Sequence, residues 1–322
     1  MTDPLAPLHA LAGTGRAHVL AADIGGSFVK LAGAGADALP LARASLPNPA
    51  QSWPDFVETL RALADAADPE RRLPLALSVA GTIDPDTGAS LAANISCITG
   101  RSLKRELTVA LGRRVDAAND ADCFALAEAL RGAGQGHRTV FGVILGTGVG
   151  GGLIWNGRIL EGAGGVSGEW GHGPVLTDLV VAGRTVPAFA CGCGQVGCVD
   201  ASGSARGMER IDAALHPERP ARDSRAIVEA WRLSEADAQS TVETWLGRLA
   251  GPLALVLNAT GASVVPVGGG LSNAPDLLTA LDARLRASIL RRSDAPIVRP
   301  AELGPEAGLV GAALLGLGAG QD

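Results

Sequence analysis

The chain has 322 residues, enough for two domains or one large one, and its 47% hydrophobic and 19% charged residues exclude an intrinsically disordered protein. Acidic residues outnumber basic residues by 33 to 27, which argues against nucleic acid and against an anionic membrane as partners. The 44 glycines and 19 prolines follow no collagen-like period and therefore indicate many tight turns.

The N-terminal part of the sequence predicts a strand, a glycine turn and a second strand. Residues 1–17 show no strong periodicity, and we interpret them as a flexible tail. An apolar run over residues 18–22 ends in the sequence Asp-Ile-Gly-Gly-Ser, and the apolar pattern resumes over residues 28–32. The turn between the two strands therefore carries a carboxylate and a hydroxyl.

Two helices and a buried strand are predicted next. Residues 53–67 place their hydrophobic side chains on one helical face and predict a helix. Residues 75–79 predict a short buried strand. Residues 121–130 predict a helix that opens just after Asn119 and Asp120.

The pattern of strand, glycine turn and strand then occurs again. Residues 140–145 are apolar and run into a glycine-rich turn, and residues 153–159 predict a hairpin with Asn-Gly at its turn. A third apolar strand over residues 263–267 ends in three glycines, and residues 308–318 predict a C-terminal helix. Strands that alternate with helices predict an α/β protein, and the repeat predicts two similar halves that face each other across a cleft.

Glycine turns at strand ends can bind phosphate, because they expose backbone N–H groups without a side chain in the way. Residues 146–151 formally match the G-x-G-x-x-G dinucleotide fingerprint, but that fingerprint requires a helix directly after it and a hairpin is predicted here. Neither lysine precedes Ser or Thr, which excludes a P-loop. A lone glycine turn is more often a plain hairpin turn. The hydroxyls of Ser27 and Thr147 and the carboxylate of Asp23 favour phosphate binding instead.

Three of the five cysteines, Cys191, Cys193 and Cys198, lie within eight positions. This spacing argues against a disulfide scaffold and favours a metal site in a reducing compartment over three incidental cysteines. Three thiolates are one ligand short of a tetrahedral zinc site, and His172, flanked by glycines, is the leading fourth ligand. The other candidates are Cys97, Cys123, His9, His18, His137 and His216. A closed set of four protein ligands predicts a structural zinc ion.

The sequence contains no apparent targeting or membrane segment. Residues 1–15 hold Asp3 and no Lys or Arg, so the charged start of a signal peptide is missing. Residues 249–273 carry no charge, but two prolines and three consecutive glycines interrupt them, which favours a buried helix and a buried strand over a membrane span. We therefore expect a cytoplasmic protein.

The two glycine turns, at residues 23–30 and 145–152, resemble the phosphate loops of the actin-like sugar-kinase superfamily. The resemblance implies the actin-like ATPase (ribonuclease H-like) fold, with ATP and Mg²⁺ bound in a cleft between two domains. It implies that Asp23 lies near the Mg²⁺ ion and that the turn hydroxyls donate to phosphate oxygens, with Ser27 in place of the usual Thr. The nucleotide-binding residues implied in this way are Asp23, Gly25, Gly26, Ser27, Lys30, Gly146, Thr147, Gly148, Gly268, Gly269 and Gly270.

A second pair of motifs is similar to those of the ROK family, which contains sugar kinases and transcription repressors. Residues 168–172 match G-E-x-G-H, and residues 191–198 match C-x-C-G-x-x-G-C. The resemblance covers the chain from about residue 18 onward, and it implies that His172 and the three cysteines hold one structural Zn²⁺. The repressors resemble the kinases with a DNA-binding domain in front, and few residues precede Asp23 here, so we expect a kinase.

The resemblance also implies a catalytic base. Without it, an Asn-Asp pair before an apolar helix is most simply a helix N-cap. The family has its catalytic aspartate in this N-D-A context, which implies that Asp120 accepts the proton of the sugar 6-hydroxyl while Asn119 binds ring hydroxyls. We interpret Asp122 as an acid that stabilises the helix N-terminus.

Sugar-binding residues are implied in the same way. The resemblance assigns Glu169 to the ring hydroxyls, and His172 both to zinc and, through its other ring nitrogen, to the sugar. The family has Glu where this chain has Asp200, which is one methylene shorter. Either the loop moves in, a water molecule bridges the gap, or the contact with the sugar is weaker. Gly81 and Asn94 complete the implied sugar-binding set.

The activity implied is ATP-dependent phosphorylation of the 6-hydroxyl of N-acetyl-D-glucosamine, because residues 119–126, 142–148 and 269–273 resemble the kinases for that sugar most closely. N-acetylmannosamine, glucose or fructose as the acceptor stays open, as does a non-catalytic sugar-sensing regulator. We expect a homodimer with small-molecule partners, without nucleic acid or membrane.

The expected organisation has three parts. Residues 1–17 form the tail, residues 18–118 with 301–322 form a small domain with the first phosphate loop, and residues 119–300 form a large domain. The large domain is expected to hold Asp120, the second phosphate loop and the zinc site.

Overall fold

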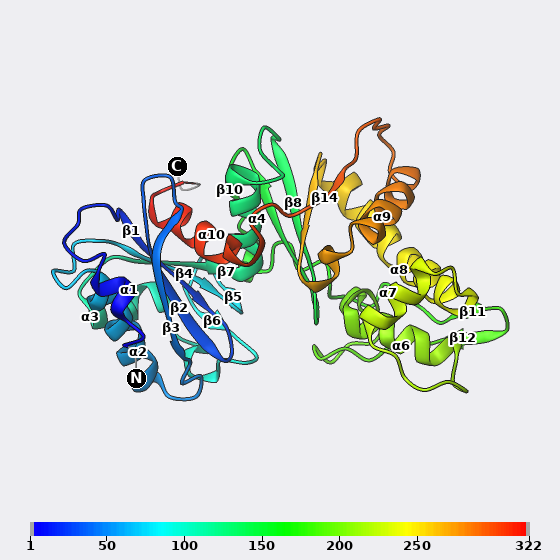
Figure 1. The fold of residues 1–322 in the computed structure, drawn as a ribbon, viewed down its shortest axis with the longest axis horizontal. Helices are drawn as coiled ribbons and strands as arrows, with labels where there is room; N and C mark the ends of the chain where they lie inside the picture. The colour runs from blue at the N-terminus through cyan, green and yellow to red at the C-terminus, as the bar shows by residue number, and fades with distance from the viewer. Residues whose placement is uncertain (1–2, 320–322) are drawn as a thin grey trace. The chain divides into compact units, whose positions relative to one another are not determined.

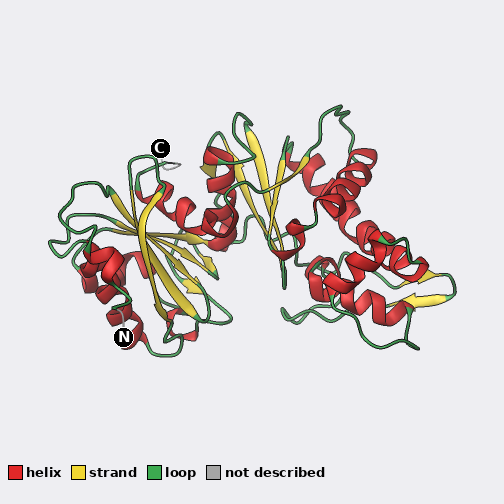
Figure 2. Ribbon diagram, viewed as in Figure 1, coloured by secondary structure: helices red, strands yellow, loops and turns green. Residues whose placement is uncertain are grey.

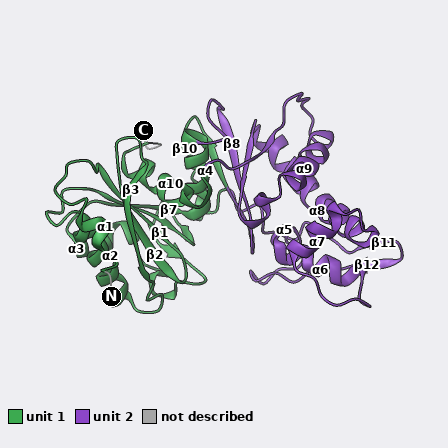
Figure 3. Ribbon diagram, viewed as in Figure 1, with its two compact units in different colours: residues 1–131, 152–167, 303–322 green, residues 132–151, 168–302 purple. Residues whose placement is uncertain are grey.

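The computed structural model describes residues 3–319. The chain divides into two compact units (Figure 3): the first comprises residues 1–131, 152–167 and 303–322, and the second comprises residues 132–151 and 168–302. Within residues 3–319, no helix is long and apolar enough to cross a membrane.

The first unit contains a mixed sheet with the strand order β3-β2-β1-β4-β7 (Figure 1). Strand β1 pairs with β2 in antiparallel fashion and with β4 in parallel fashion, and β4 is parallel to β7. Every residue of β4 is buried, as expected for a central strand covered on both faces. The strands of this unit are β1 (Val19–Ile24), β2 (Phe28–Ala34), β3 (Pro40–Pro47), β4 (Leu75–Val79), β5 (Thr82–Ile83), β6 (Ser90–Leu91), β7 (Val115–Asn119) and β10 (Arg158–Ile159).

Helices cover both faces of this sheet (Figure 2). Helix α2 begins after Ser52, whose hydroxyl accepts a hydrogen bond from the Asp55 backbone N–H, and it buries Phe56 and Leu60 in the core. Helix α10 packs against β1, β4 and α4. The helices of this unit are α1 (Ala6–His9), α2 (Trp53–Ala67), η1 (Ser96–Ile98), α3 (Leu103–Leu111), α4 (Asp120–Arg131), η2 (Ala163–Gly165), η4 (Gly304–Glu306) and α10 (Ala307–Gly316).

A second mixed sheet has the order β10-β9-β8-β13-β14, and the boundary between the units falls within β9. The predicted hairpin is confirmed, because Asn156 and Gly157 both have positive φ, as a type I′ turn requires. The remaining strands are β8 (Thr139–Leu145), β9 (Val149–Trp155), β11 (Leu179–Val181), β12 (Arg184–Val186), β13 (Val265–Gly268) and β14 (Val298–Pro300).

The helices of the second unit include the long helix α8, which buries Trp245 completely. The uncharged stretch over residues 249–273 is a helix followed by the buried strand β13, as predicted. The helices are α5 (Val199–Gly203), α6 (Ala205–Leu215), α7 (Ser224–Arg232), α8 (Ala236–Thr260), η3 (Gly270–Asn273) and α9 (Pro275–Ser288).

The structure differs from the expected organisation in several places, and it puts residues 152–167 in the first unit and residues 301–302 in the second. The expected tail contains α1, and Leu8 is fully buried in the core of the first unit. Helix α4 belongs to the first unit rather than to a domain that starts at residue 119, because α10 packs closely along it. Gly311 permits this approach, since a Cβ there would overlap the Cys123 carbonyl oxygen. Residues 1–2 and 320–322 of the expected parts lie outside the described residues.

Candidate functional site

The first glycine turn joins β1 to β2 in the first unit. The Gly25 N–H donates to the Phe28 carbonyl oxygen at 3.1 Å, and the Asn48 side chain donates to the Gly25 carbonyl oxygen at 2.6 Å. Ser27 is exposed at the turn. A Cβ on Gly26 would lie 3.3 Å from the Cβ of Asn94, so the expected sugar-binding Asn94 lies beside this turn.

Asp23 is the penultimate residue of β1, and side chains from neighbouring strands contact both of its carboxylate oxygens. Lys30 on β2 places Nζ 3.5 Å from Oδ2, and Ser78 on β4 donates its hydroxyl to Oδ1 at 3.2 Å. No sequence motif marks Ser78. The sequence feature that could have identified Ser78 is that it is the one hydroxyl residue within the otherwise apolar strand Leu75–Val79.

Asp120 lies where β7 ends and α4 begins, and its Oδ1 accepts the Ala121 N–H at 2.9 Å. Asn119 caps the helix, because its Oδ1 accepts the N–H groups of Ala121 and Asp122 at 2.8 and 3.2 Å. Its Nδ2 donates to the Gly81 carbonyl oxygen at 3.0 Å, which brings together the three predicted residues Gly81, Asn119 and Asp120. The helix N-terminus stabilises a negative charge at this position.

The second glycine turn and the three-glycine segment lie side by side in the second unit, at the carboxyl ends of the parallel strands β8 and β13. The Gly146 N–H donates to the Gly148 carbonyl oxygen at 3.0 Å, and the Gly146 carbonyl oxygen accepts the Ala205 N–H at 2.9 Å. Thr147 is exposed between them. The backbone of the turn and the Thr147 hydroxyl are thus accessible at the carboxyl ends of these strands. Open α/β sheets bind ligands at this edge.

We expect Gly269→Ala to destabilise the protein by about 3 kcal/mol, because Gly269 adopts a backbone conformation nearly confined to glycine. Its φ is 88° and its ψ is 176°, and an added Cβ would overlap the Leu145 carbonyl oxygen. Urea denaturation would measure the loss. Gly270→Ala is the matched control, because nothing lies within 4 Å of a Cβ there. Equal stability of the two variants would contradict the prediction.

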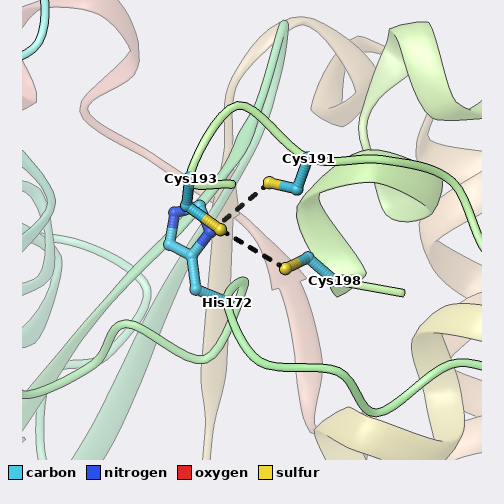
Figure 4. A group of neighbouring side chains, drawn as sticks. All are labelled: His172, Cys191, Cys193 and Cys198. Carbon is cyan, nitrogen blue, oxygen red and sulfur yellow. Dashed lines mark hydrogen bonds between the residues drawn. The ribbon is translucent and has the colours of Figure 1, made fainter. Parts of the chain in front are cut away.

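His172 and the three predicted cysteines come together in the second unit (Figure 4), with their potential ligand atoms all within 4.8 Å of one another. The Cys191 Sγ lies 3.7 Å from His172 Nδ1, and the Cys193 and Cys198 sulfur atoms are 3.6 Å apart. A tetrahedral zinc ion with Zn–S bonds of about 2.3 Å separates its sulfur ligands by about 3.8 Å. The donor set therefore fits zinc. The alternative ligands Cys97 and Cys123 lie in the other unit.

The three thiols differ in acidity. The backbone N–H of Gln195 lowers the pKa of Cys193 to about 7, whereas burial raises the pKa of Cys191 to about 12 and also raises that of Cys198. Metals bind the thiolate form, so a cation held here would displace the remaining thiol protons.

The imidazole of His172 faces different partners at its two nitrogens. Nδ1 faces the cysteines, and Nε2 lies 3.8 Å from Glu169 Oε2. Burial raises the pKa of Glu169, against the opposing effect of the nearby His172. At 3.8 Å this contact is too long for a hydrogen bond, but a carboxylate on this side favours the ring orientation in which Nδ1 faces the cysteines.

Asp200 lies between the cysteine loop and the second glycine turn. Its Oδ1 accepts the Val149 N–H at 2.7 Å, and its Oδ2 lies 3.6 Å from the Cys191 sulfur. A Cβ on Gly148 would lie 2.8 Å from the same Oδ1, so the turn has room for this carboxylate only because residue 148 is glycine. This contact with the turn was not predictable from the sequence motifs.

If ATP and a sugar bind as the family resemblance implies, we expect Asp200→Ala to raise the KM for ATP more than the KM for the sugar. The variant removes a charge-assisted hydrogen bond to the turn, a loss of about 1.5 kcal/mol or a little over tenfold. Initial rates at varied ATP and at varied sugar would separate the two constants. An increase confined to the sugar KM would show that Asp200 acts at the sugar instead.

Comparison with known proteins identifies relatives along nearly the whole chain. The model of the ROK family matches residues 19–318. The N-acetyl-D-glucosamine kinase of Yersinia enterocolitica is 34% identical over 298 residues, which cover 92% of this chain and 98% of the relative. The crystal structure of a ROK hexokinase from Thermus thermophilus has a TM-score of 0.77 and 32% identity, covering 92% of this chain and 96% of that one. A ROK glucokinase from Streptomyces griseus, solved with glucose and AMPPNP, has a TM-score of 0.71 and 27% identity and covers 92% and 98%.

Proposed function

This chain belongs to the ROK family, and from that premise we propose that it transfers the γ-phosphoryl group of ATP to the 6-hydroxyl of N-acetyl-D-glucosamine. Family membership confirms the predicted α/β actin-like ATPase fold. The observation that carries the proposal is the carboxylate of Asp120, held at the start of α4 beside Asn119 and Gly81.

Asp120 acts as the general base in this proposal. It accepts the proton of the 6-hydroxyl as the sugar oxygen attacks the γ-phosphorus and ADP leaves, so the products are N-acetylglucosamine 6-phosphate, ADP and the protonated carboxyl group. The adjacent Asn119 amide uses one N–H on Gly81. Its second N–H is the group that we assign to a ring hydroxyl of the sugar.

We propose that Glu169 and His172 bind further sugar hydroxyls, together with Gly81, Asn94 and, to a lesser extent, Asp200. His172 and the three clustered cysteines would hold one zinc ion. All four positions are protein ligands, so zinc would stabilise the loop and fix the His172 ring rather than activate a water molecule. The 3.8 Å approach of Glu169 to the second nitrogen of His172 supports this assignment.

We assign the nucleotide to the two glycine turns, with Mg²⁺ near Asp23. Ser27 and Thr147 are exposed and can donate hydroxyl hydrogen bonds to phosphate oxygens. The glycines of these turns and Lys30 would contact the phosphates, and residues 268–270 would lie against the adenosine.

We further propose that the protein is a cytoplasmic homodimer that binds small molecules and no nucleic acid. Size-exclusion chromatography with light scattering tests the oligomeric state. A monomer at micromolar concentration would contradict it.

The activity is tested by ADP release with ATP and Mg²⁺ in the presence of N-acetylglucosamine, N-acetylmannosamine, glucose or fructose. Turnover is expected to be highest with N-acetylglucosamine. A preference for another of the four sugars would keep the mechanism and contradict the substrate. A folded, zinc-loaded protein inactive on all four would favour the sugar-sensing regulator.

A further inference from the structure

A row of polar side chains crosses three neighbouring strands of the first unit. Asp23 on β1 is in register with Lys30 on the antiparallel strand β2 and with Ser78 on the parallel strand β4. Residues in register on adjacent strands project from the same face of a sheet. The register therefore brings an ammonium group and a hydroxyl to opposite sides of one carboxylate.

The two partners hold the carboxylate differently. The Lys30 ammonium group lies 3.5 Å from Oδ2, which is long for a hydrogen bond, and its side chain is 49% exposed. The Ser78 side chain is completely buried, and its hydroxyl donates to Oδ1 at 3.2 Å. Ser78 therefore fixes Asp23 from inside the protein, whereas Lys30 can move away when a ligand arrives.

The residues around Ser78 offer its hydroxyl few hydrogen-bond acceptors other than Asp23. Helix α10 closes over the pair, since a Cβ on Gly308 would lie 3.0 Å from Asp23 Oδ1 and 3.3 Å from Ser78 Oγ. The buried Cys123 lies within hydrogen-bonding reach of the Ser78 hydroxyl. Burial and the charges of Asp122 and Asp120 raise the pKa of Cys123 well above its usual value, so this thiol keeps its proton. A protonated thiol is only a weak acceptor, so the Asp23 carboxylate is the much stronger acceptor for the Ser78 hydroxyl.

A buried hydroxyl in an apolar strand costs stability unless it is hydrogen-bonded, and here its partner is the carboxylate that we assign to the nucleotide's Mg²⁺. We propose that Ser78 is a positioning residue, which holds Asp23 in the orientation that receives the Mg²⁺–nucleotide complex. This inference rests on the proposed function for the identity of the ligand. It adds a residue that neither the sequence motifs nor the family resemblance singled out.

The test is the affinity of Ser78→Ala for AMPPNP, measured by titration calorimetry with Mg²⁺ and again with EDTA. We expect binding of the Mg²⁺ complex to weaken on the order of tenfold, which is the scale for a lost hydrogen bond to a charged group. Binding of metal-free AMPPNP should stay unchanged, and a purely structural role of Ser78 would not produce this selectivity. Equal affinity of variant and wild type for the Mg²⁺ complex would overturn the inference.

Ser90→Ala is the matched control, because Ser90 is also a buried serine of the first unit and donates its hydroxyl to the Ile98 carbonyl oxygen. It should lose stability without a Mg²⁺-selective loss of binding, and a selective loss in both variants would overturn the inference. Should Ser78→Ala fail to fold, Ser78→Cys, with a slightly larger side chain and a weaker donor, must show the same selective loss.

Calorimetry separates this inference from the proposed function, because AMPPNP binding needs no turnover. A wild-type protein that phosphorylates sugar, with a Ser78→Ala variant that binds normally, contradicts the inference alone. A wild-type protein that binds Mg²⁺–AMPPNP and phosphorylates no sugar contradicts the proposed function, while a selective loss in Ser78→Ala still supports the inference. Absence of wild-type binding overturns both.

Discussion

Asp120→Asn is expected to fold like the wild type and to lose turnover by about 10²-fold or more, the usual contribution of a general base. The fold should survive because an Asn Oδ1 can still accept the Ala121 N–H that Asp120 Oδ1 accepts at 2.9 Å. The amide cannot take the proton of the sugar hydroxyl at neutral pH. Steady-state kcat and the melting temperature would be measured on the same preparation.

Asp122→Asn is the control for this prediction. Asp122 also lies in the first turn of α4 and favours the helix N-terminus by its charge, so the variant should lose a few tenths of a kcal/mol of stability to about 1 kcal/mol. It should keep most of the turnover. Near-normal turnover of Asp120→Asn, or an equal loss in Asp122→Asn, would remove Asp120 from the role of base.

The second large effect is expected at the cysteine cluster. Purified protein should contain about one zinc ion per chain, and Cys193→Ser should lose metal and at least about 3 kcal/mol of stability, because metal binding at such sites contributes directly to folding. Cys193 suits this test because its side chain is exposed, so little packing is lost with it. Elemental analysis and thermal denaturation with and without a chelator would measure both effects.

Cys97→Ser is the matched variant, since Cys97 is a free, partly exposed cysteine that lies outside the cluster. It should keep both the metal and the stability. Wild-type protein without zinc, or a chelator that leaves the melting temperature unchanged, would contradict the metal assignment.

Local patterns in the sequence predicted local structure well. The Asn-Gly hairpin, the amphipathic helix α2 and the paired glycine turns all depend on residues close together in the chain, and each is confirmed in the structure. The cysteine spacing likewise predicted three of the four potential metal ligands that lie together in the structure. The fourth is His172, which was predicted from the glycines on either side of it.

Features that depend on packing between distant segments were not predictable in this way. Leu8 becomes buried only because the sheet and α2 provide a surface for α1. Ser78 reaches Asp23 only through the register of β1 with β4, and Asp200 reaches Val149 only when the cysteine loop folds back on the turn. A single sequence carries no spacing rule for these contacts.

The discontinuity of the first unit has a consequence for the order in which the protein folds during synthesis. Its last helix, α10, packs on β1 and β4 but is translated after the whole second unit. The second unit can therefore be complete while the first still lacks the helix that covers one face of its sheet. Domains generally fold as units while the chain emerges from the ribosome. Although the N-terminal part of the first unit is synthesised first, this unit therefore completes its hydrophobic core after the second unit. Until α10 has emerged from the ribosome, the apolar face that it covers stays open to chaperones and to aggregation.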